Sequence, residues 1–411
     1  MQDSSRYAVG IDIGTTTVRC VVGHLDATTG TPTIVGVGEV PNTGMRKGAI
    51  VNLNGPAQAI DEALGEAERM SGFEVNAAAI SINGSHILST AADGMIAVGA
   101  ADHLVGPEDV ARLEEVATIG KVPANREILE VIPHSYRLDG QDNIKDPIGM
   151  TGTRLEINAN VISAMVPQVT ALHSVLELAK VTPNVITPSV VAAAKAVLTE
   201  QQLENGVAVI DLGGATTGLA VFEEGDLQYT AVIPIGSNNI TNDLAIGLKT
   251  DPIIAEQVKV THGSATSQTG SDTVSIKQEK ETTEFARADI DEIIEARLEE
   301  LFEAISKELK KAGRHAKLPS GVVLTGGGAK LKNIVDYTKE ALGLAVRIGS
   351  ASGFGGVAEH LDEPQFAAAA GLMLIDAQGA SSAHGQAAGR SKSAAKQAGG
   401  MIKRLFGRFR A

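Results

Sequence analysis

The stretch Gly206–Leu227, GVAVIDLGGATTGLAVFEEGDL, predicts a strand, a tight turn and a second strand. Its two apolar runs, Val207–Ile210 and Leu219–Phe222, have the length and composition of buried strands. The glycines between them allow backbone N–H groups to approach a bulky anion, and successive N–H groups in a turn form an anion-binding nest without a helix. An ordinary glycine-rich hairpin would show the same pattern, so this stretch alone leaves both interpretations open.

A second copy of the pattern lies in YAVGIDIGTTTVRCVVGH, at residues 7–24. The segments VGIDIGTTTVRCVV and AVIDLGGATTGLAV share the order apolar, Asp, apolar, Gly, turn, Thr and apolar. In each copy an aspartate, Asp12 or Asp211, follows an apolar strand, where its carboxylate is well placed to hold a hydrated Mg²⁺. The wide spacing of the copies predicts two related α/β lobes, each presenting one phosphate-binding hairpin to a shared cleft.

Rossmann and P-loop sites differ from this pattern, because they run from a strand through a glycine loop into a helix. Neither G-x-G-x-x-G nor G-x-x-x-x-G-K-[ST] occurs in that context, so both folds are set aside. The strongest predicted helix is Ala286–Lys311, which carries one apolar stripe. Gly321–Gly328, GVVLTGGG, predicts a strand and a glycine turn, compatible with flat contact to a planar group and equally with a plain turn.

Composition narrows the class of protein. Hydrophobic residues make up 43% of the 411 residues, charged residues 20% and aromatic residues 3%, which is typical of a soluble α/β protein with a sizeable core. We expect no secretory signal, and no apolar run is long enough to span a membrane. The single cysteine, Cys20, excludes an internal disulfide, fits a reducing cytosol and is most simply a small buried residue.

The net charge of −14 is unevenly distributed. Seven basic residues and no acidic residue follow Asp376, so the preceding part of the chain is seven charges more negative than the whole. Such an acidic body argues against nucleic acid as a main partner. Residues 377–400 are rich in Ala, Gly, Ser and Gln, which predicts a flexible linker.

Residues 401–411 predict an amphipathic helix. One face of this helix is apolar and aromatic and the other is basic, as in helices that lie in the interface of an anionic membrane. Docking of the segment on its own protein or on another protein is the alternative. The residues predicted to bind the membrane are Met401, Ile402, Lys403, Arg404, Leu405, Phe406, Arg408, Phe409 and Arg410.

Two Asp-Gly-Thr hairpins, the helical AEQVK at 255–259 and the turn GGGA at 326–329 occur in the order typical of the actin, Hsp70 and sugar-kinase superfamily. Within it, SINGSHILST, DPIGMTGTRLE, IPIGSNNITNDLAIGL, AEQVK and VVLTGGGAKLKNI resemble the FtsA family of bacterial cell-division proteins, over residues 6–376 and again at 401–411. The resemblance implies an α/β, actin-like two-lobed ATPase fold. Its subdomains would be 1A (6–84 and 164–195), the insert 1C (85–163), 2A (196–230 and 312–376) and 2B (231–311).

The resemblance also implies roles for the matched residues. ATP would bind between the hairpins, with Mg²⁺ held through water by Asp12 and Asp211, and Glu256 and Lys259 would contact the ribose. The residues that would cradle the phosphates are Gly14, Thr15, Thr16, Thr17, Gly213, Gly214, Thr216 and Thr217. Those that would flank the adenine are Gly326, Gly327, Gly328 and Ala329.

One position departs from the superfamily pattern. Many members have Asp after the second threonine of the second hairpin, where this chain has Gly218. The missing polar group predicts slow hydrolysis rather than loss of nucleotide binding, and the sequence offers no convincing general base. We therefore expect at most a slow ATPase, in which ATP acts chiefly as a conformational and assembly ligand.

By resemblance, the protein would polymerise at the cytoplasmic face of the bacterial inner membrane, at the division septum, and tether FtsZ filaments there. Subdomain 2B would bind FtsZ, and 1C would make longitudinal contacts between copies and recruit later division proteins. One alternative is a PilM-like pilus-assembly scaffold, in which a basic C-terminal helix is not expected. Another is a phosphotransferase of the sugar-kinase type, which needs a substrate pocket with a catalytic Asp. An Hsp70-like chaperone needs a peptide-binding domain, for which no residues remain.

Overall fold

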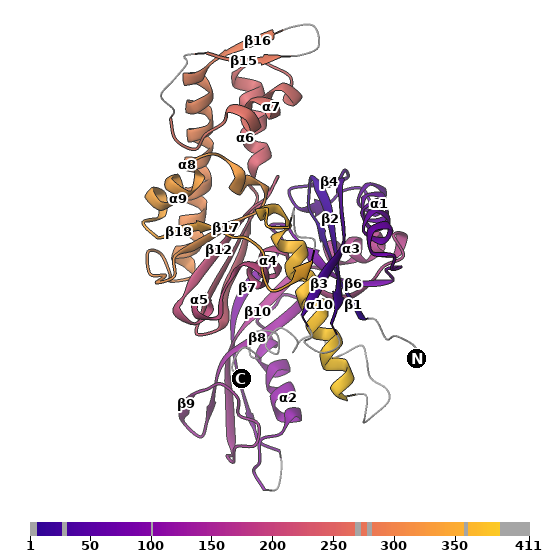
Figure 1. The fold of residues 1–411 in the computed structure, drawn as a ribbon. Helices are drawn as coiled ribbons and strands as arrows, with labels where there is room; N and C mark the ends of the chain where they lie inside the picture. Colours follow the sequence, from indigo (N-terminus) through magenta and orange to yellow (C-terminus); the bar gives the residue numbers. More distant parts are fainter. Residues whose placement is uncertain are drawn as a thin grey trace.

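The computed structural model describes residues 6–26, 31–99, 102–267, 273–277, 282–356 and 361–386. Residues 401–411, predicted to form the membrane-binding helix, lie outside this part of the chain. Figure 1 shows two central lobes, a helical group from residues 237–311 at one end and a small sheet from residues 88–165 at the other. The nucleotide-site motifs fall in the two central lobes, which are therefore described first.

The first lobe is built on a mixed sheet around the hairpin predicted at residues 7–24. The described strands of this sheet have the order β11 (Thr182–Pro188), β6 (Ala77–Ile82), β1 (Arg6–Ile13), β2 (Thr17–Leu25), β3 (Pro32–Pro41) and β19 (Gly355–Gly356). Strands β1 and β2 pair antiparallel up to Ile13 and Val18, and β1 runs parallel to β6. Val and Ile side chains of the hairpin are buried, because β-branched residues pack well on a pleated surface.

The sheet of the second lobe repeats this arrangement around Gly206–Leu227. The described strands have the order β14 (Asp226–Ile233), β13 (Thr217–Glu223), β12 (Val207–Leu212), β17 (Val322–Thr325) and β18 (Val346–Ile348). Strand β12 pairs antiparallel with β13 and parallel with β17, as β1 does with β2 and β6. The repeated strand order gives the two related α/β lobes that the paired motifs predict.

A buried helix joins the two lobes. All nine residues of α4 (Ser189–Val197) are buried, and the helix contacts β12 and β13 of the second sheet and β6 and β11 of the first. Apart from Ser189 and Lys195, its residues are apolar all round the helix, as is expected in such an interior position. The helices that pack around the lobes are α1 (Asn54–Ser71), α3 (Val166–Leu178), α5 (Glu200–Asn205), α9 (Ile334–Leu342) and α10 (Ala367–Gln386). Short elements complete them: β4 (Met45–Arg46), β5 (Ala49–Ile50), η1 (Gly327–Lys330) and η2 (Pro364–Phe366).

Helix α10 corrects the predicted extent of the second lobe. Residues 312–376 were assigned to subdomain 2A, but α10 packs on β1 and β6 of the first sheet and on α4. Asp376 accepts a hydrogen bond of 2.9 Å from a backbone N–H of β1. Gly371 lies so close to α4 that a Cβ atom there would be 1.8 Å from Ala192 O. The chain returns to the first lobe near Gly355, where β19 pairs with β3.

Helix α10 also corrects the start of the predicted linker. It continues past residue 377, where the linker was predicted to begin, and ends at Gln386. Packing of its first turns supplies the costly nucleus of the helix, and propagation then adds one hydrogen bond per residue. Residues 387–400 of the predicted linker lie outside the described part of the chain.

A small sheet occupies the range predicted as an insert at 85–163. Its described strands have the order β7 (Leu88–Ala97), β10 (Arg154–Met165), β8 (Arg126–Leu138) and β9 (Gln141–Ile144), and α2 (Pro107–Thr118) packs on β7 and β10. It has a core of its own, which includes Leu113, Tyr136 and Leu155. The chain enters and leaves it side by side, because Leu88 pairs with Ser163.

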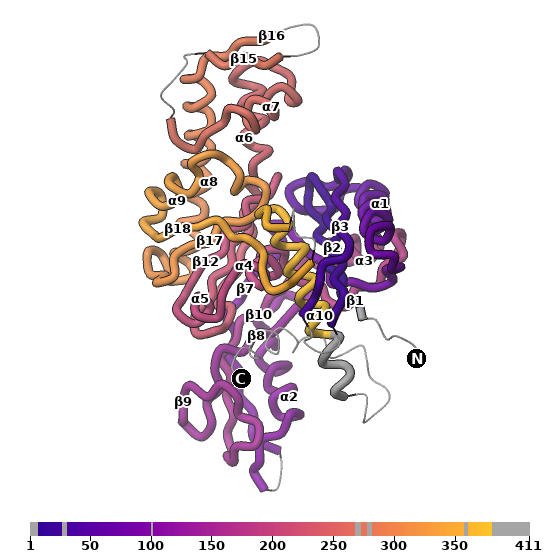
Figure 2. Tube along the Cα trace, viewed as in Figure 1, coloured from indigo at the N-terminus to yellow at the C-terminus, as the bar shows by residue number. Residues whose placement is uncertain are grey.

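The helical group at the other end contains the predicted stripe. Its elements are α6 (Ser237–Gly247), α7 (Pro252–His262), β15 (Thr273–Lys277), β16 (Thr282–Ala286) and α8 (Arg287–Lys311). Ile290, Ile294, Leu298, Phe302 and Ile305 of α8 are buried, as the stripe predicts. Figure 2 follows the chain from this group back into the second lobe. Among the described residues, no helix combines the length and apolar character needed to cross a membrane.

Candidate functional site

A cleft of about 1070 Å³ lies between the two hairpins. The structure places fifteen of the sixteen predicted nucleotide-site residues on its walls: Asp12, Gly14, Thr15, Thr16, Thr17, Asp211, Gly213, Gly214, Thr216, Thr217, Glu256, Lys259, Gly326, Gly327 and Gly328. Ala329 is the exception. It is 1% exposed and packs in the core of the second lobe, because the short helix η1 turns its methyl group inward.

The two hairpin turns have the same internal geometry. Gly14 N donates to Thr17 O at 3.1 Å, and Gly213 N donates to Thr216 O at 3.0 Å. These two amides close the turns, so an anion would be met by the N–H groups that follow them. The tips also approach each other, because a Cβ atom on Gly214 would lie 2.8 Å from Thr16 Cγ2. Two nests therefore converge on one space, as a polyphosphate requires.

The carbonyl oxygens of each hairpin turn accept hydrogen bonds from polar groups that were not predicted as site residues. In the first lobe, Asn42 donates from its N to Thr16 O at 2.8 Å and from its side chain to Gly14 O at 2.7 Å. In the second lobe, Ser237 N and Asn238 N, at the start of α6, donate to Gly213 O and Gly214 O at 2.9 and 2.7 Å. These bonds occupy the turn carbonyls and orient the opposite N–H groups towards the cleft.

Sequence offers only a weak signal for these polar groups. Ser237 and Asn238 follow Gly236 at a predicted helix start, where small polar residues are common. Asn42 is one polar residue after a strand, and nothing local distinguishes it from other loop asparagines. Its function depends on a contact with residues more than twenty positions away in the sequence.

The two predicted metal ligands lie near each other, Asp12 buried and Asp211 half-buried. Burial raises the pKa of Asp12, opposed by a hydrogen bond from Ser81 and by the charge of Arg19. Burial and then the negative charge of Asp12 raise the pKa of Asp211 to about 7. A carboxylate whose ionisation is opposed by a second carboxylate nearby forms a site that a divalent cation would stabilise.

The donor set fits Mg²⁺ held together with a nucleotide. In the part of the chain that the structure describes, no cluster of three or more Asp, Glu, His or Cys side chains could enclose a metal ion. Mg²⁺ usually keeps several waters and takes one or two carboxylates together with substrate phosphates. Asp12 and Asp211, which both line the cleft beside the two turns, would supply those carboxylates.

The residues predicted to contact the ribose also hold α6 and α7 together. Lys259 Nζ lies 2.9 Å from Thr241 Oγ1, 3.3 Å from Ser237 O and 2.7 Å from Glu256 Oε2. Thr241 Oγ1 also donates a hydrogen bond to Glu256. Lys259 is only 9% exposed, whereas the Glu256 side chain is 46% exposed. Glu256 is therefore the better placed of the two to meet a ligand, and Lys259 orients it.

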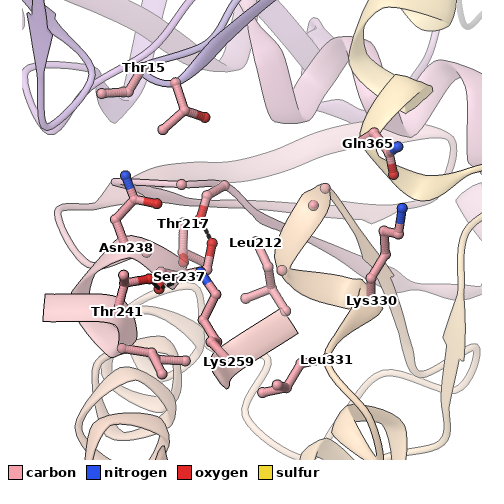
Figure 3. A pocket seen from close by; sticks show the side chains of 18 of the residues that line it. Thr15, Leu212, Thr217, Ser237, Asn238, Thr241, Lys259, Lys330, Leu331 and Gln365 are labelled. Carbon is pink, nitrogen blue, oxygen red and sulfur yellow. Dashed lines mark hydrogen bonds between the residues drawn. The ribbon is translucent and has the colours of Figure 1, made fainter. Parts of the chain in front are cut away.

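A further group of polar residues lies at the other end of the cleft. Figure 3 shows Gln365 and Lys330 facing each other there, with Thr15 across the cleft from Asn238 and Lys259. Oε1 of Gln365 is buried and has no hydrogen-bond partner among the described residues. Nearby, Gly326 N and Thr325 Oγ1 both donate to Pro364 O, so the glycine turn is anchored to the start of the segment that leads into α10.

The structure gives a physical reason for Gly218. This residue pairs with Asp211 across the second hairpin, and a Cβ atom there would lie 2.7 Å from Val190 Cβ of α4. The close packing of α4 against β13 leaves no room for the aspartate that many superfamily members have at this position. At this position α4 therefore packs directly against β13, and no polar side chain lies between them.

Comparison with solved structures defines the class of this protein. A PilM–PilN type IV pilus biogenesis complex is similar over 90% of this chain and 98% of that chain, with a TM-score of 0.66 and 18% identity. MreB5 of Spiroplasma citri bound to ADP is similar over 90% of this chain and 96% of that chain, with a TM-score of 0.54 and 14% identity. These likenesses and the two facing hairpins place the chain among proteins of the actin-like ATPase fold.

Sequence comparison then shows the family. The chain is 32% identical over 379 residues to the cell division protein FtsA of Pseudomonas aeruginosa, covering 91% of this chain and 90% of the relative. It is 36% identical over 382 residues to FtsA of Bacillus subtilis, covering 91% and 84%. Family models match at 208–371 (cell division protein FtsA) and at 84–163 (SHS2 domain inserted in FtsA). The chain belongs to the FtsA family of cell division proteins.

Proposed function

We propose that this protein binds Mg²⁺–ATP between its two lobes and uses the nucleotide as a conformational and assembly ligand. The observation that carries the proposal is the convergence of two equivalent turns, each preceded by an aspartate that lines the cleft, on one space. An actin-like neighbour, MreB5, is bound to ADP, which supports a nucleotide as the ligand.

The chain's own residues would act as follows. The N–H groups of Thr15, Thr16 and Gly214 would meet the phosphates, while Asn42 and the start of α6 hold the turns in place. Mg²⁺, when bound, neutralises phosphate charge, and Asp12 and Asp211 hold its water shell. Because the sequence offers no convincing general base, we expect nucleotide binding and its effect on the two lobes to matter more than rapid hydrolysis.

Calorimetry tests this proposal. The double variant Asp12→Ala, Asp211→Ala should lose Mg²⁺-dependent ATP binding, because both carboxylates of the cation site are gone. A matched control is Asp336→Ala, which removes an exposed aspartate on α9 and should bind as the unaltered protein does. Equal ATP affinity in the double variant and the control would contradict the proposed site.

We further propose that the protein polymerises at the inner membrane and tethers FtsZ filaments to it. Family membership supports a role at the division site. In this proposal, residues 401–411 bind anionic lipids, residues 231–311 bind FtsZ, and residues 85–163 contact further copies and later division proteins. Electron microscopy on lipid monolayers, with ATP and FtsZ added in turn, reports tethering, polymerisation and recruitment. Monolayers that recruit neither the protein nor FtsZ would contradict it.

The two alternative functions differ in their support. Identity above 30% over nine-tenths of the chain to FtsA proteins outweighs the fold-level likeness to PilM, at 18% identity. The sugar-kinase alternative has its own test, because phosphate transfer to a small metabolite at roughly 1 s⁻¹ or faster would be ordinary enzyme turnover. Such turnover would replace the proposed function.

A further inference from the structure

The inserted domain of residues 88–165 touches the lobe to which it is not covalently joined. Both of its connections run to the first lobe, through the start of β7 and the end of β10. Yet β7, β8 and β10 all lie against β14, the edge strand of the second sheet. The insert therefore bridges the two lobes at the end of the molecule away from α6–α8 (Figure 1).

Two buried or half-buried side chains of the insert hydrogen-bond to the backbone of β14. His134 Nε2 lies 3.0 Å from Leu227 O, and Asn160 Nδ2 donates to Gln228 O at 3.3 Å. Asn160 is 2% exposed, and its Oδ1 accepts a 2.7 Å hydrogen bond from Ser89 of β7. The amide is thus held in the orientation that presents its N–H group to the second lobe.

A lysine adds an ion pair to the same contact. Lys145 Nζ lies 2.8 Å from Asp226 Oδ2, at the first residue of β14, and 3.4 Å from Glu224 O in the preceding turn. It also donates to His134 O at 3.0 Å. The Asp226 side chain is 18% exposed and that of Lys145 32%, so the pair is partly shielded from solvent. One ammonium group therefore joins both sides of the contact.

The insert is fixed at its other end to the first lobe. Arg126, at the start of β8, donates to His86 O, to Ser163 O at 2.8 Å and to Ser163 Oγ at 3.0 Å. His86 lies on the segment that enters the insert, and Ser163 on the strand that leaves it. Arg126 therefore ties together the segments by which the chain enters and leaves the insert, and β8 and β10 also pack against α3 of the first lobe.

We propose that Lys145, His134 and Asn160 form a strap that holds the second lobe, through β14, in the position seen here. A change in the separation of the lobes must then either turn the insert or break the strap. The strap favours the state in which Gly214 and Thr16 approach each other, and so favours nucleotide binding. This last step rests on the proposed function, and by linkage a bound nucleotide strengthens the strap.

Distances between spin labels test the strap without any ligand. Labels on Gln141→Cys in the insert and Glu340→Cys on α9 report the insert relative to the second lobe, and the native Cys20 is buried. Lys145→Met should broaden or lengthen the distance distribution. A matched control is Lys121→Met, whose ion pair with Asp93 lies within the insert, and it should leave the distribution unchanged. Identical distributions in both variants would overturn the strap.

Calorimetry with Mg²⁺–ATP tests the coupling. Lys145→Met and Asp226→Asn should each weaken binding at least threefold, the double variant should weaken it no further than Lys145→Met alone, and Lys121→Met should bind normally. Unchanged affinity in the strap variants would overturn the coupling. If the unaltered protein binds no nucleotide, the proposed function fails and the coupling with it, while the ligand-free label distances still decide the strap.

Discussion

The neighbouring carboxyl groups of Asp12 and Asp211 predict that nucleotide binding releases a proton. The pKa of Asp211 is raised to about 7, first by burial and then by the charge of Asp12. Near pH 7, about half of the ligand-free molecules therefore hold a proton that must leave before both carboxylates can face Mg²⁺. Because the protonated form competes with the cation, the affinity for Mg²⁺–ATP should fall as pH falls through this range.

The size of the effect follows from the pKa. Between pH 8 and pH 6 the fraction of sites without the proton drops from about nine-tenths to about one-tenth, so affinity should fall about tenfold. Titration calorimetry in two buffers of different ionisation enthalpy should show release of about half a proton at pH 7. The ATP phosphates also titrate, with a pKa of roughly 6, so a comparison is needed.

Asp211→Asn provides that comparison. It should bind Mg²⁺–ATP more weakly at pH 8, but its affinity should change with pH only through the phosphates, and it should release less of a proton. The difference in slope between the two proteins isolates the carboxylate pair. Parallel pH profiles, or proton release of the same size in both proteins, would refute the argument that the two aspartates share a proton in the ligand-free cleft.

Three further predictions concern packing and the C-terminal segment. Gly371→Ala should destabilise the protein by about 1–3 kcal/mol, because its methyl group overpacks the crossing of α10 with α4. Gly65→Ala is the control: this glycine of α1 has room for a methyl group, so the variant should be slightly more stable. Thermal unfolding measures both changes, and equal melting temperatures of the two variants would contradict the packing argument. Gly218→Asp should lower the melting temperature through its clash with Val190 and should not accelerate hydrolysis, so a stable and faster variant would contradict the packing argument. Phe406→Glu should abolish binding to anionic vesicles in a flotation assay, because it places a charge on the apolar face, and unchanged flotation would exclude the membrane helix.

Features with a local signature could be predicted from the sequence. An aspartate after an apolar strand and a Gly-Thr turn identify the hairpins around Asp12 and Asp211, and the apolar stripe of α8 has the period of a helix. The repeat of the hairpin motif also predicts two lobes, because each copy must begin a sheet of its own. These elements are specified by neighbours a few residues apart, which is the range that sequence patterns describe.

Features that depend on distant contacts could not be predicted in this way. The position of α10 on the first sheet is set by small residues such as Gly371, which carry no signal of their partner. Asn42 acts on a hairpin that precedes it by many residues, and Lys145 forms its ion pair with a strand of the other lobe. Ala329 follows three glycines that do line the cleft, and only the turn of η1 directs it into the core.

The contact of α10 with β1 has a consequence for synthesis of the chain. Asp376 and Val9 are separated by 367 positions, so β1 leaves the ribosome long before its partner exists. At about 5–20 residues per second, the delay is roughly 20–70 s. During that time most residues of the second lobe and the insert are synthesised, but α10, the helix that covers one face of the first sheet, is still missing. The nascent first lobe is therefore the part of the chain for which chaperones are expected to matter most.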